Sequence, residues 1–205
     1  MGESILSNER KAALILGGIL LSEGAWIAVN LYFSTPRFLR YCGFTTFAGY
    51  PAWAMALIVA AFFIYHSSRL PSVRANLVHM DGLKMLAIGV GIAAGFCEEA
   101  VFRKMLMDHF AHLGWAGIAQ IAISALAFGF AHAIWGLFRG SLRAALGAMV
   151  ATGSLGLLLA VVFVIGGRNL APCIISHMLI NFFAEPGLVL SALRGEMGRA
   201  LPSAR

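Results

Sequence analysis

Charged residues are scarce in this sequence, where only 12% of the 205 residues are Asp, Glu, Lys or Arg. Soluble domains carry about 25% charged residues, whereas 60% of this chain is hydrophobic. A soluble core of this size could not hide that much apolar surface, which excludes the soluble enzyme and binding-domain classes. The composition instead fits a protein embedded in a lipid bilayer, in which about 20 apolar residues form one membrane-spanning helix.

The sequence also lacks the marks of nucleic-acid binding and of a cysteine-based framework. The net charge is +6, but the basic residues stand singly between apolar stretches, without a basic patch interleaved with aromatics. We therefore expect no nucleic-acid partner and a bilayer with anionic headgroups instead. Cys42, Cys97 and Cys173 show no CxxC spacing, which argues against a disulfide framework or a zinc knuckle and favours small apolar fillers.

Long apolar runs are what the sequence does contain. No segment is patterned as a strand, and six segments reach or approach the length of a membrane span: Lys11 to Phe33, Ala48 to His66, Lys84 to Phe110, Gly114 to Gly136, Leu142 to Ile165 and Leu170 to Leu193. The sequence therefore predicts an all-α polytopic transmembrane bundle of about six spans, a single integral membrane domain over residues 1–205. Pro186 falls inside the last segment, where we expect a kink.

The basic residues predict the orientation. Ten of the 15 Lys and Arg residues, Lys84 among them, lie at the termini and in the loops on the same side as the termini. The other five, which include Arg103, are assigned to the opposite side. Because cytoplasmic loops are rich in Lys and Arg, both termini are predicted to be cytoplasmic. The expected location is the cell membrane, with multiple passes, and in a bacterium the inner membrane.

Two adjacent carboxylates, Glu98 and Glu99, stand inside the third apolar segment. Each charged group there costs at least about 2.5 kcal/mol. On a helix Glu99 shares a face with Arg103, four residues later, whereas Glu98 is rotated by about 100° and faces another cavity. The pattern predicts one carboxylate paired with the arginine and one available as a general base. The structural alternatives are a buried ion-pair cluster that fixes helix register, or a helix end in water.

Two further pairs have the same spacing of four residues. Phe128 and His132 share a helix face in the fourth segment, and His177 and Asn181 share one in the last segment. A histidine and an asparagine can donate two hydrogen bonds to one oxygen, as an oxyanion on an attacked carbonyl requires. Each pair alone could equally join helices through hydrogen bonds. Together with the carboxylates, they provide a base, a proton shuttle and an oxyanion clamp.

These residues carry a resemblance to a known family. The ordered motifs Glu98-Glu99-x-x-x-Arg103, Phe128-x-x-x-His132 and His177-x-x-x-Asn181 resemble the motifs of the CAAX-processing and bacteriocin-processing (CPBP, or Abi) intramembrane endopeptidases, without a substitution. The resemblance covers the chain from Gly95 to about Phe183. The motif-bearing core is expected at about residues 84–193.

The resemblance implies a role for each motif residue. Glu98 and His132 would activate water, His177 and Asn181 would stabilise the oxyanion, and Glu99 with Arg103 would support them. Both zinc-dependent and glutamate-dependent mechanisms have been assigned to the family. No HExxH is present, and asparagine is a poor zinc ligand, so a metal-free site without a cofactor is favoured. The expected partner is a protein or peptide substrate at the membrane.

Two other function classes remain open from the residues alone. Glu23 and Glu185 also lie within apolar segments, and intramembrane acids mark proton or cation pathways, which is the transporter alternative. Glu185 follows His177 by eight residues on roughly the same face, so it is expected to line the same cavity. A silent membrane scaffold or immunity protein is the third class.

The expected depths of the motif residues disagree. At about 1.5 Å per residue, Glu98 and His177 reach similar depths near the outer face. His132, counted from Gly114, falls close to the cytoplasmic end instead. The sequence leaves three explanations: a later start of the fourth helix, a break near Gly129, or a site that opens to the cytoplasm.

Overall fold

A computed structural model describes residues 2–134 and 142–196, with side chains from Asn8 onward. The described residues are helical and contain no strand. The first half comprises α1 (Gly2–Tyr41), α2 (Tyr50–Ser67), α3 (Pro71–Asn76) and α4 (Gly82–Glu99). A π-helical turn (Ala100–Met105) follows and leads into α5 (Leu106–His112). The second half comprises α6 (Gly117–His132), α8 (Leu142–Ile165), α9 (Ala171–Ala184) and α10 (Gly187–Arg194).

Helices occupy most of the described part of each of the six predicted apolar segments, which confirms the all-α polytopic bundle. The predicted end of the fourth segment at Gly136 lies outside the described residues. By length and composition, four helices of the described chain can cross a membrane, or five if the bent pair α9 and α10 counts as one span. α6 has only 16 residues, about 24 Å, which is shorter than a bilayer core.

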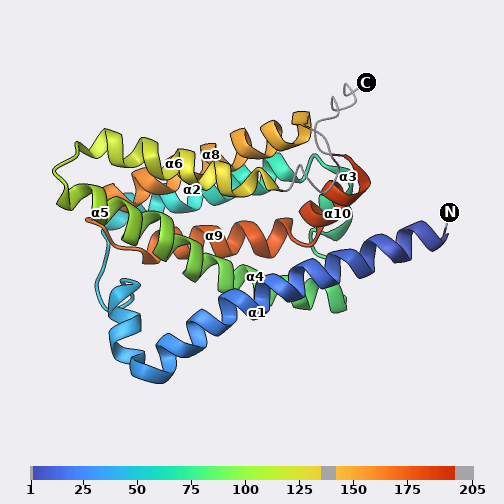
Figure 1. Cartoon of the computed structure of the whole chain (residues 1–205), viewed down its shortest axis with the longest axis horizontal. Helices are drawn as coiled ribbons and strands as arrows, with labels where there is room; N and C mark the ends of the chain where they lie inside the picture. Colours follow the sequence, from blue (N-terminus) through green and yellow to red (C-terminus); the bar gives the residue numbers. More distant parts are fainter. Residues whose placement is uncertain (1, 135–141, 197–205) are drawn as a thin grey trace.

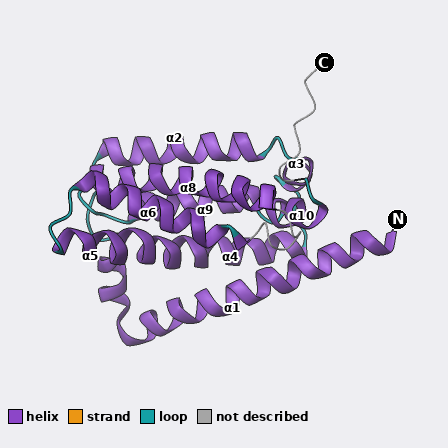
Figure 2. Cartoon of the chain, turned by 45° about the horizontal axis from the view of Figure 1, so that its top comes forward, coloured by secondary structure: helices purple, strands orange, loops and turns teal. Residues whose placement is uncertain are grey.

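The helices lie side by side in layers (Figures 1 and 2). Figure 2 shows α2 along one side of the bundle and α1 running obliquely along the opposite side, with α6, α8, α9 and α4 between them. Figure 1 shows that the start of α1, α3 and α10 lie at one end of the bundle, whereas the α5–α6 turn lies at the other. The first and last described residues therefore lie at the same end of the bundle, as a topology with both termini on one side requires.

Prolines and a capping carboxylate define several helix boundaries. α2, α3 and α9 carry a proline in the first turn, where the missing N–H has no intrahelical partner to lose. Asp81 caps α4 by accepting a hydrogen bond from the Lys84 backbone N–H at 2.7 Å. Near Pro36 the backbone of α1 leaves the helical region at Ser34. Pro186 stands at the break between α9 and α10, which are bent by 56°, so the predicted kink is confirmed.

Glycines let the motif-bearing helices approach one another closely. A Cβ at Gly95 of α4 would lie 2.6 Å from Cγ of Met178 in α9. A Cβ at Gly129 of α6 would lie 2.7 Å from the Met149 carbonyl oxygen in α8. Any side chain at these two positions would push the helices apart. The close packing holds α4 against α9 and α6 against α8.

The observed extents of the third and fourth helical segments resolve the disagreement between the expected depths of Glu98 and His132. Gly82–His112 forms one continuous helical segment of 31 residues, and Glu98 lies 14 residues before its end at His112. α6 starts only at Gly117, so His132 lies 15 residues beyond its start. Both residues are therefore about 21–23 Å from the connecting turn. The two residues therefore lie at matching depths, because the fourth helix begins at Gly117 rather than Gly114 and the third extends to His112.

Candidate active site

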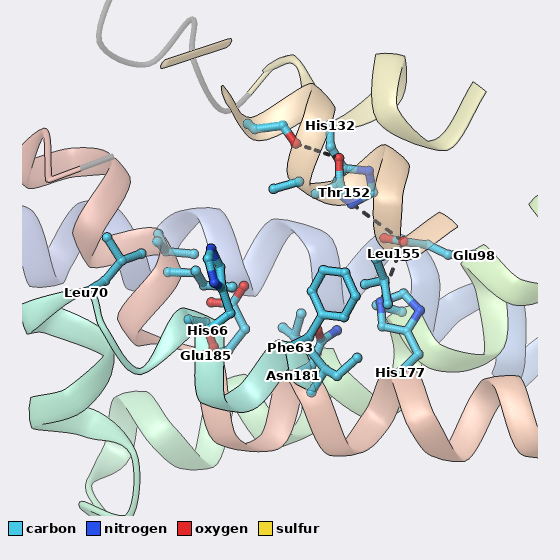
Figure 3. A pocket seen from close by; sticks show the side chains of 18 of the residues that line it. Phe63, His66, Leu70, Glu98, His132, Thr152, Leu155, His177, Asn181 and Glu185 are labelled. Atoms are coloured by element: carbon cyan, nitrogen blue, oxygen red, sulfur yellow. Dashed lines mark hydrogen bonds and ion pairs between the residues drawn. The ribbon is translucent and has the colours of Figure 1, made fainter. Parts of the chain in front are cut away.

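The end of α4 places Glu98 between the two motif histidines. Its Oε2 atom lies 3.6 Å from Nε2 of His132 and 3.9 Å from Nε2 of His177. Figure 3 shows the Glu98 carboxylate flanked by the two rings, which come from α6 and α9. This oxygen is buried and has no hydrogen-bond partner within the described residues. At such separations one bridging water can contact all three groups.

The backbone of α6 fixes the tautomer of His132. Its Nδ1 lies 2.8 Å from the Phe128 carbonyl oxygen, which can only accept a hydrogen bond, so Nδ1 must carry the proton. In the neutral ring Nε2 then presents a lone pair toward Glu98. A lone pair and a carboxylate repel each other unless a proton or a water lies between them. His132 is thus oriented as a proton acceptor beside Glu98.

Glu99 faces away from the cavity and is fully buried. Its Oε2 lies 3.1 Å from Nε of Arg103, whose side chain is also fully buried. The contact is an ion pair without hydrogen-bond alignment, since both atoms lack a hydrogen-bond partner among the described residues. Its Oε1 lies 2.8 Å from Nδ1 of His177. The predicted pairing of Glu99 with Arg103 is therefore present, and it extends to a motif histidine.

Phe128 packs against three of the motif side chains. The guanidinium of Arg103 lies over its ring at 4.5 Å from the centroid, which stabilises a buried cation. The His132 and His177 rings lie 4.4 and 5.9 Å from the same ring. Arg103 also donates to the Gly156 carbonyl at 3.4 Å. Phe128 therefore fixes the spacing between the arginine and the two imidazoles.

A π-helical turn follows the two glutamates directly. The sequence predicted an uninterrupted α-helix here, whereas Ala100–Met105 follows the wider i→i+5 pattern. Such turns are rare and are frequently found at functional sites. Arg103 lies within this turn and is directed into the bundle, against Glu99.

A cavity of about 410 Å³ opens beside Glu98. His132, His177 and Asn181 line it, so the structure brings all four predicted catalytic side chains to one space. The Asn181 side chain makes no hydrogen bond within the described residues. Glu185 lines the same cavity, as its position on the face of His177 predicted.

Several cavity residues were not singled out from the sequence. Phe63 and His66 come from α2, and Thr152 and Leu155 come from α8. The α8 segment carries no charged residue near this point, and nothing in its pattern distinguishes the face that turns inward. Only the packing of α8 against α6, and of α2 against α8 and α9, identifies these residues.

Lys84 does not lie in a loop, and its use as a topology marker was wrong. It is buried, and its ammonium donates to the Phe183 and Glu185 carbonyl oxygens at 3.3 and 2.7 Å. It thereby satisfies free carbonyls at the end of α9. Arg103, assigned to the opposite loop, is buried as well. Removing both residues from the count leaves the excess of basic residues on the side of the termini.

Glu23 also turns toward the bundle from α1. One of its carboxylate oxygens is buried without a hydrogen-bond partner in the described part of the chain. It lies close enough to Glu98 and His177 for electrostatic interaction. The described residues contain no group of three His, Cys, Asp or Glu side chains arranged to hold a metal ion. Cys42, Cys97 and Cys173 are free thiols.

Residues 81–183 match the family model described as type II CAAX prenyl endopeptidase, Rce1-like. The match covers half of the chain. The chain belongs to the Rce1-like family. Comparisons with curated proteins and with solved structures give no match.

The matched region runs from the cap of α4 to the end of α9 and contains all seven residues named in the three motifs. Membership of this CPBP-type family confirms the resemblance drawn from the motifs. It supports a CAAX-type intramembrane protease function in general. Together with the apolar helices, it makes the chain a multi-pass membrane protein.

Proposed function

We propose that this chain is an intramembrane endopeptidase in which Glu98 and His132 activate a water molecule. The observation that supports this most directly is the buried Oε2 of Glu98, 3.6 and 3.9 Å from two imidazole nitrogens. A water bridging these groups would donate one proton to Glu98 or to His132. Its oxygen would then become nucleophilic in a site largely shielded from bulk water.

The reaction needs only these groups and the substrate. The water oxygen attacks the carbonyl carbon of the scissile peptide bond, and its proton passes to the pair formed by Glu98 and His132. The carbonyl electrons move onto the oxygen and form the tetrahedral intermediate. When the C–N bond breaks, the same pair returns the proton to the leaving amine. The products are a new carboxyl terminus and a new amino terminus.

His177 and Asn181 are proposed to stabilise the oxyanion. Because Nδ1 of His177 faces Glu99, its Nε2 becomes a donor toward the cavity when the ring is protonated. The Glu99 carboxylate compensates the charge of that imidazolium, as a carboxylate does in a catalytic triad. Asn181 lines the cavity one helical turn away, and its amide makes no hydrogen bond to the described residues, so it can supply the second donor. Glu99 and Arg103 act as positioning residues, because Glu99 contacts His177 and Arg103 contacts Glu99.

We further propose that the site works without a metal ion. The fourth side chain of the site is Asn181, a poor zinc ligand, and its amide is better suited to donating a hydrogen bond. Chelators should leave turnover unchanged. Recovery of activity by zinc, after loss on chelation, would make Glu98, His132 and His177 ligands rather than acid–base groups.

The substitution Glu98→Gln tests the proposal. It keeps shape and hydrogen bonding but cannot accept the proton of water, so turnover should fall by about 10² to 10⁴. Mass spectrometry of membrane peptides from cells with wild-type and Glu98→Gln protein would identify products that depend on Glu98. Cys97→Ser, at the adjacent position, serves as the matched control and should process normally. Wild-type product levels in Glu98→Gln would refute the proposal.

The transporter alternative rests on Glu23 and Glu185 as further acids. A proton path has no use for the paired donors His177 and Asn181, whereas amide hydrolysis requires them. In a scaffold, the two adjacent glutamates would have no function, although burying them costs free energy. The family match favours the peptidase over both.

A further inference from the structure

Glu185 forms a second polar group in the cavity, away from the proposed centre. It follows the end of α9, at the break before α10. Figure 3 shows Glu185 beside His66 at one end of the cavity, with Glu98 and the two motif histidines at the other. Phe63 and Asn181 lie between them in the same view, and Leu155 and Ile180 are among the apolar residues that line the cavity. The cavity therefore has a carboxylate at each end and a largely apolar lining.

The Glu185 carboxylate has no ion-pair partner among the described residues. It contacts the Val189 backbone N–H, but its Oε2 is buried without a hydrogen-bond partner in that part of the chain. Lys84, the nearest buried cation, is occupied by backbone carbonyls rather than by this carboxylate. Arg69 also lines the cavity, but its guanidinium turns to the Tyr65 hydroxyl at 3.5 Å.

A helix-capping role alone does not explain this residue. Serine or asparagine could cap the start of α10 equally well. Burying a carboxylate without a paired charge is costly, and one buried oxygen remains unsatisfied among the described residues. A bound cation would compensate the charge and satisfy that oxygen through a charge-assisted hydrogen bond.

The helix sets the distance between the two polar ends. His177 and Glu185 are eight residues apart, about 12 Å along α9. An extended peptide advances about 3.3 Å per residue. A peptide whose scissile carbonyl lies at His177, beside Glu98, would thus bring its third or fourth residue from the scissile bond to Glu185.

We propose that Glu185 is a specificity residue that binds a basic side chain of the substrate, three or four residues from the scissile bond. The inference rests on the proposed function, because it assumes a peptide in this cavity. It assigns the substrate class as an apolar segment that carries a lysine or an arginine at this spacing.

The test uses apolar reporter peptides that carry one lysine at successive positions on either side of the scissile bond. The wild-type protein should cleave the peptide with lysine at the third or fourth position roughly tenfold to hundredfold better than its alanine counterpart. Glu185→Gln should lose this preference, and Glu185→Lys should transfer it to peptides with aspartate. Glu9→Gln, at an exposed position of α1, is the matched control and should keep it.

If Glu185 had a purely structural role, its substitution would change the cleavage rates of all peptides by the same factor, and that result would overturn the inference. So would a wild-type protein that cleaves without regard to lysine, although the peptidase proposal would then stand. Binding of the same peptides to Glu98→Gln separates the remaining outcomes. Lysine-dependent binding without any wild-type cleavage would support the cation site and refute the peptidase. If the peptides were neither bound nor cleaved, both the role of Glu185 and the peptidase proposal would be refuted.

Discussion

Replacing Arg103 by alanine is expected to destabilise the bundle far more than replacing its neighbour Lys104. Arg103 is fully buried and forms three contacts: the Glu99 carboxylate at 3.1 Å, the Phe128 ring at 4.5 Å and the Gly156 carbonyl at 3.4 Å. Its removal leaves the buried Glu99 charge uncompensated, which costs about 3 to 5 kcal/mol. The lost cation–π contact adds about 0.5 to 2 kcal/mol.

Lys104 provides a matched control in the same π-helical turn. It pairs with Asp108 at 2.9 Å with the same spacing of four residues, but the two side chains are 27% and 25% exposed. Water screens such a pair, so Lys104→Ala should cost only about 0.2 to 1 kcal/mol. The two substitutions thus compare one kind of ion pair at two levels of burial.

Thermal unfolding of the purified variants in detergent measures the difference. Arg103→Ala should lower Tm by roughly 10 °C or more, because a protein of this size shifts by about 2 to 4 °C per kcal/mol. The double variant Glu99→Gln/Arg103→Met removes both charges and should be more stable than Arg103→Ala. If Arg103→Ala melts like Lys104→Ala, the buried pair does not stabilise the fold and the reasoning fails.

Three further predictions concern the site, a surface contact and the topology. Asn181→Ala removes one oxyanion donor, so the rate of the chemical step should fall by about 10² to 10³; a change confined to KM would contradict that role. Burial raises the pKa of Glu196, but hydrogen bonds from Ser72 and Ser191 and the charge of Arg194 outweigh it and hold that pKa below its usual range. The contact should therefore stabilise the fold fully at pH values above the usual pKa of glutamate, and this stabilisation should be lost as the pH falls through the lowered pKa. In Glu196→Gln, the dependence of the unfolding free energy on pH should be weaker over this range. Reporter fusions at residue 205 and in the connection between α2 and α4, which contains α3 (Pro71–Asn76), should both report cytoplasm; a periplasmic signal from either would reverse the orientation.

The sequence alone determined the solvent, the class of fold and the chemistry of the motifs. Sparse charge and long apolar runs leave a helical membrane bundle as the way to satisfy the backbone, since helices close their own hydrogen bonds. The spacing of four residues placed Glu99 with Arg103 on one face, because that spacing is one helical turn. Polar residues in an apolar solvent are costly, so Glu98, His132 and His177 could be recognised without a structure.

The tertiary structure alone decided how these faces meet and at what depth. The start of α6 at Gly117 depends on the turn that follows α5, and this start brought His132 level with Glu98. Local pattern did not predict the π-helical turn, because it depends on how Arg103 packs against Glu99. The burial of Lys84 against the end of α9 joins residues 101 positions apart. Such long-range contacts depend on packing across helices, which the periodicity of one segment does not encode.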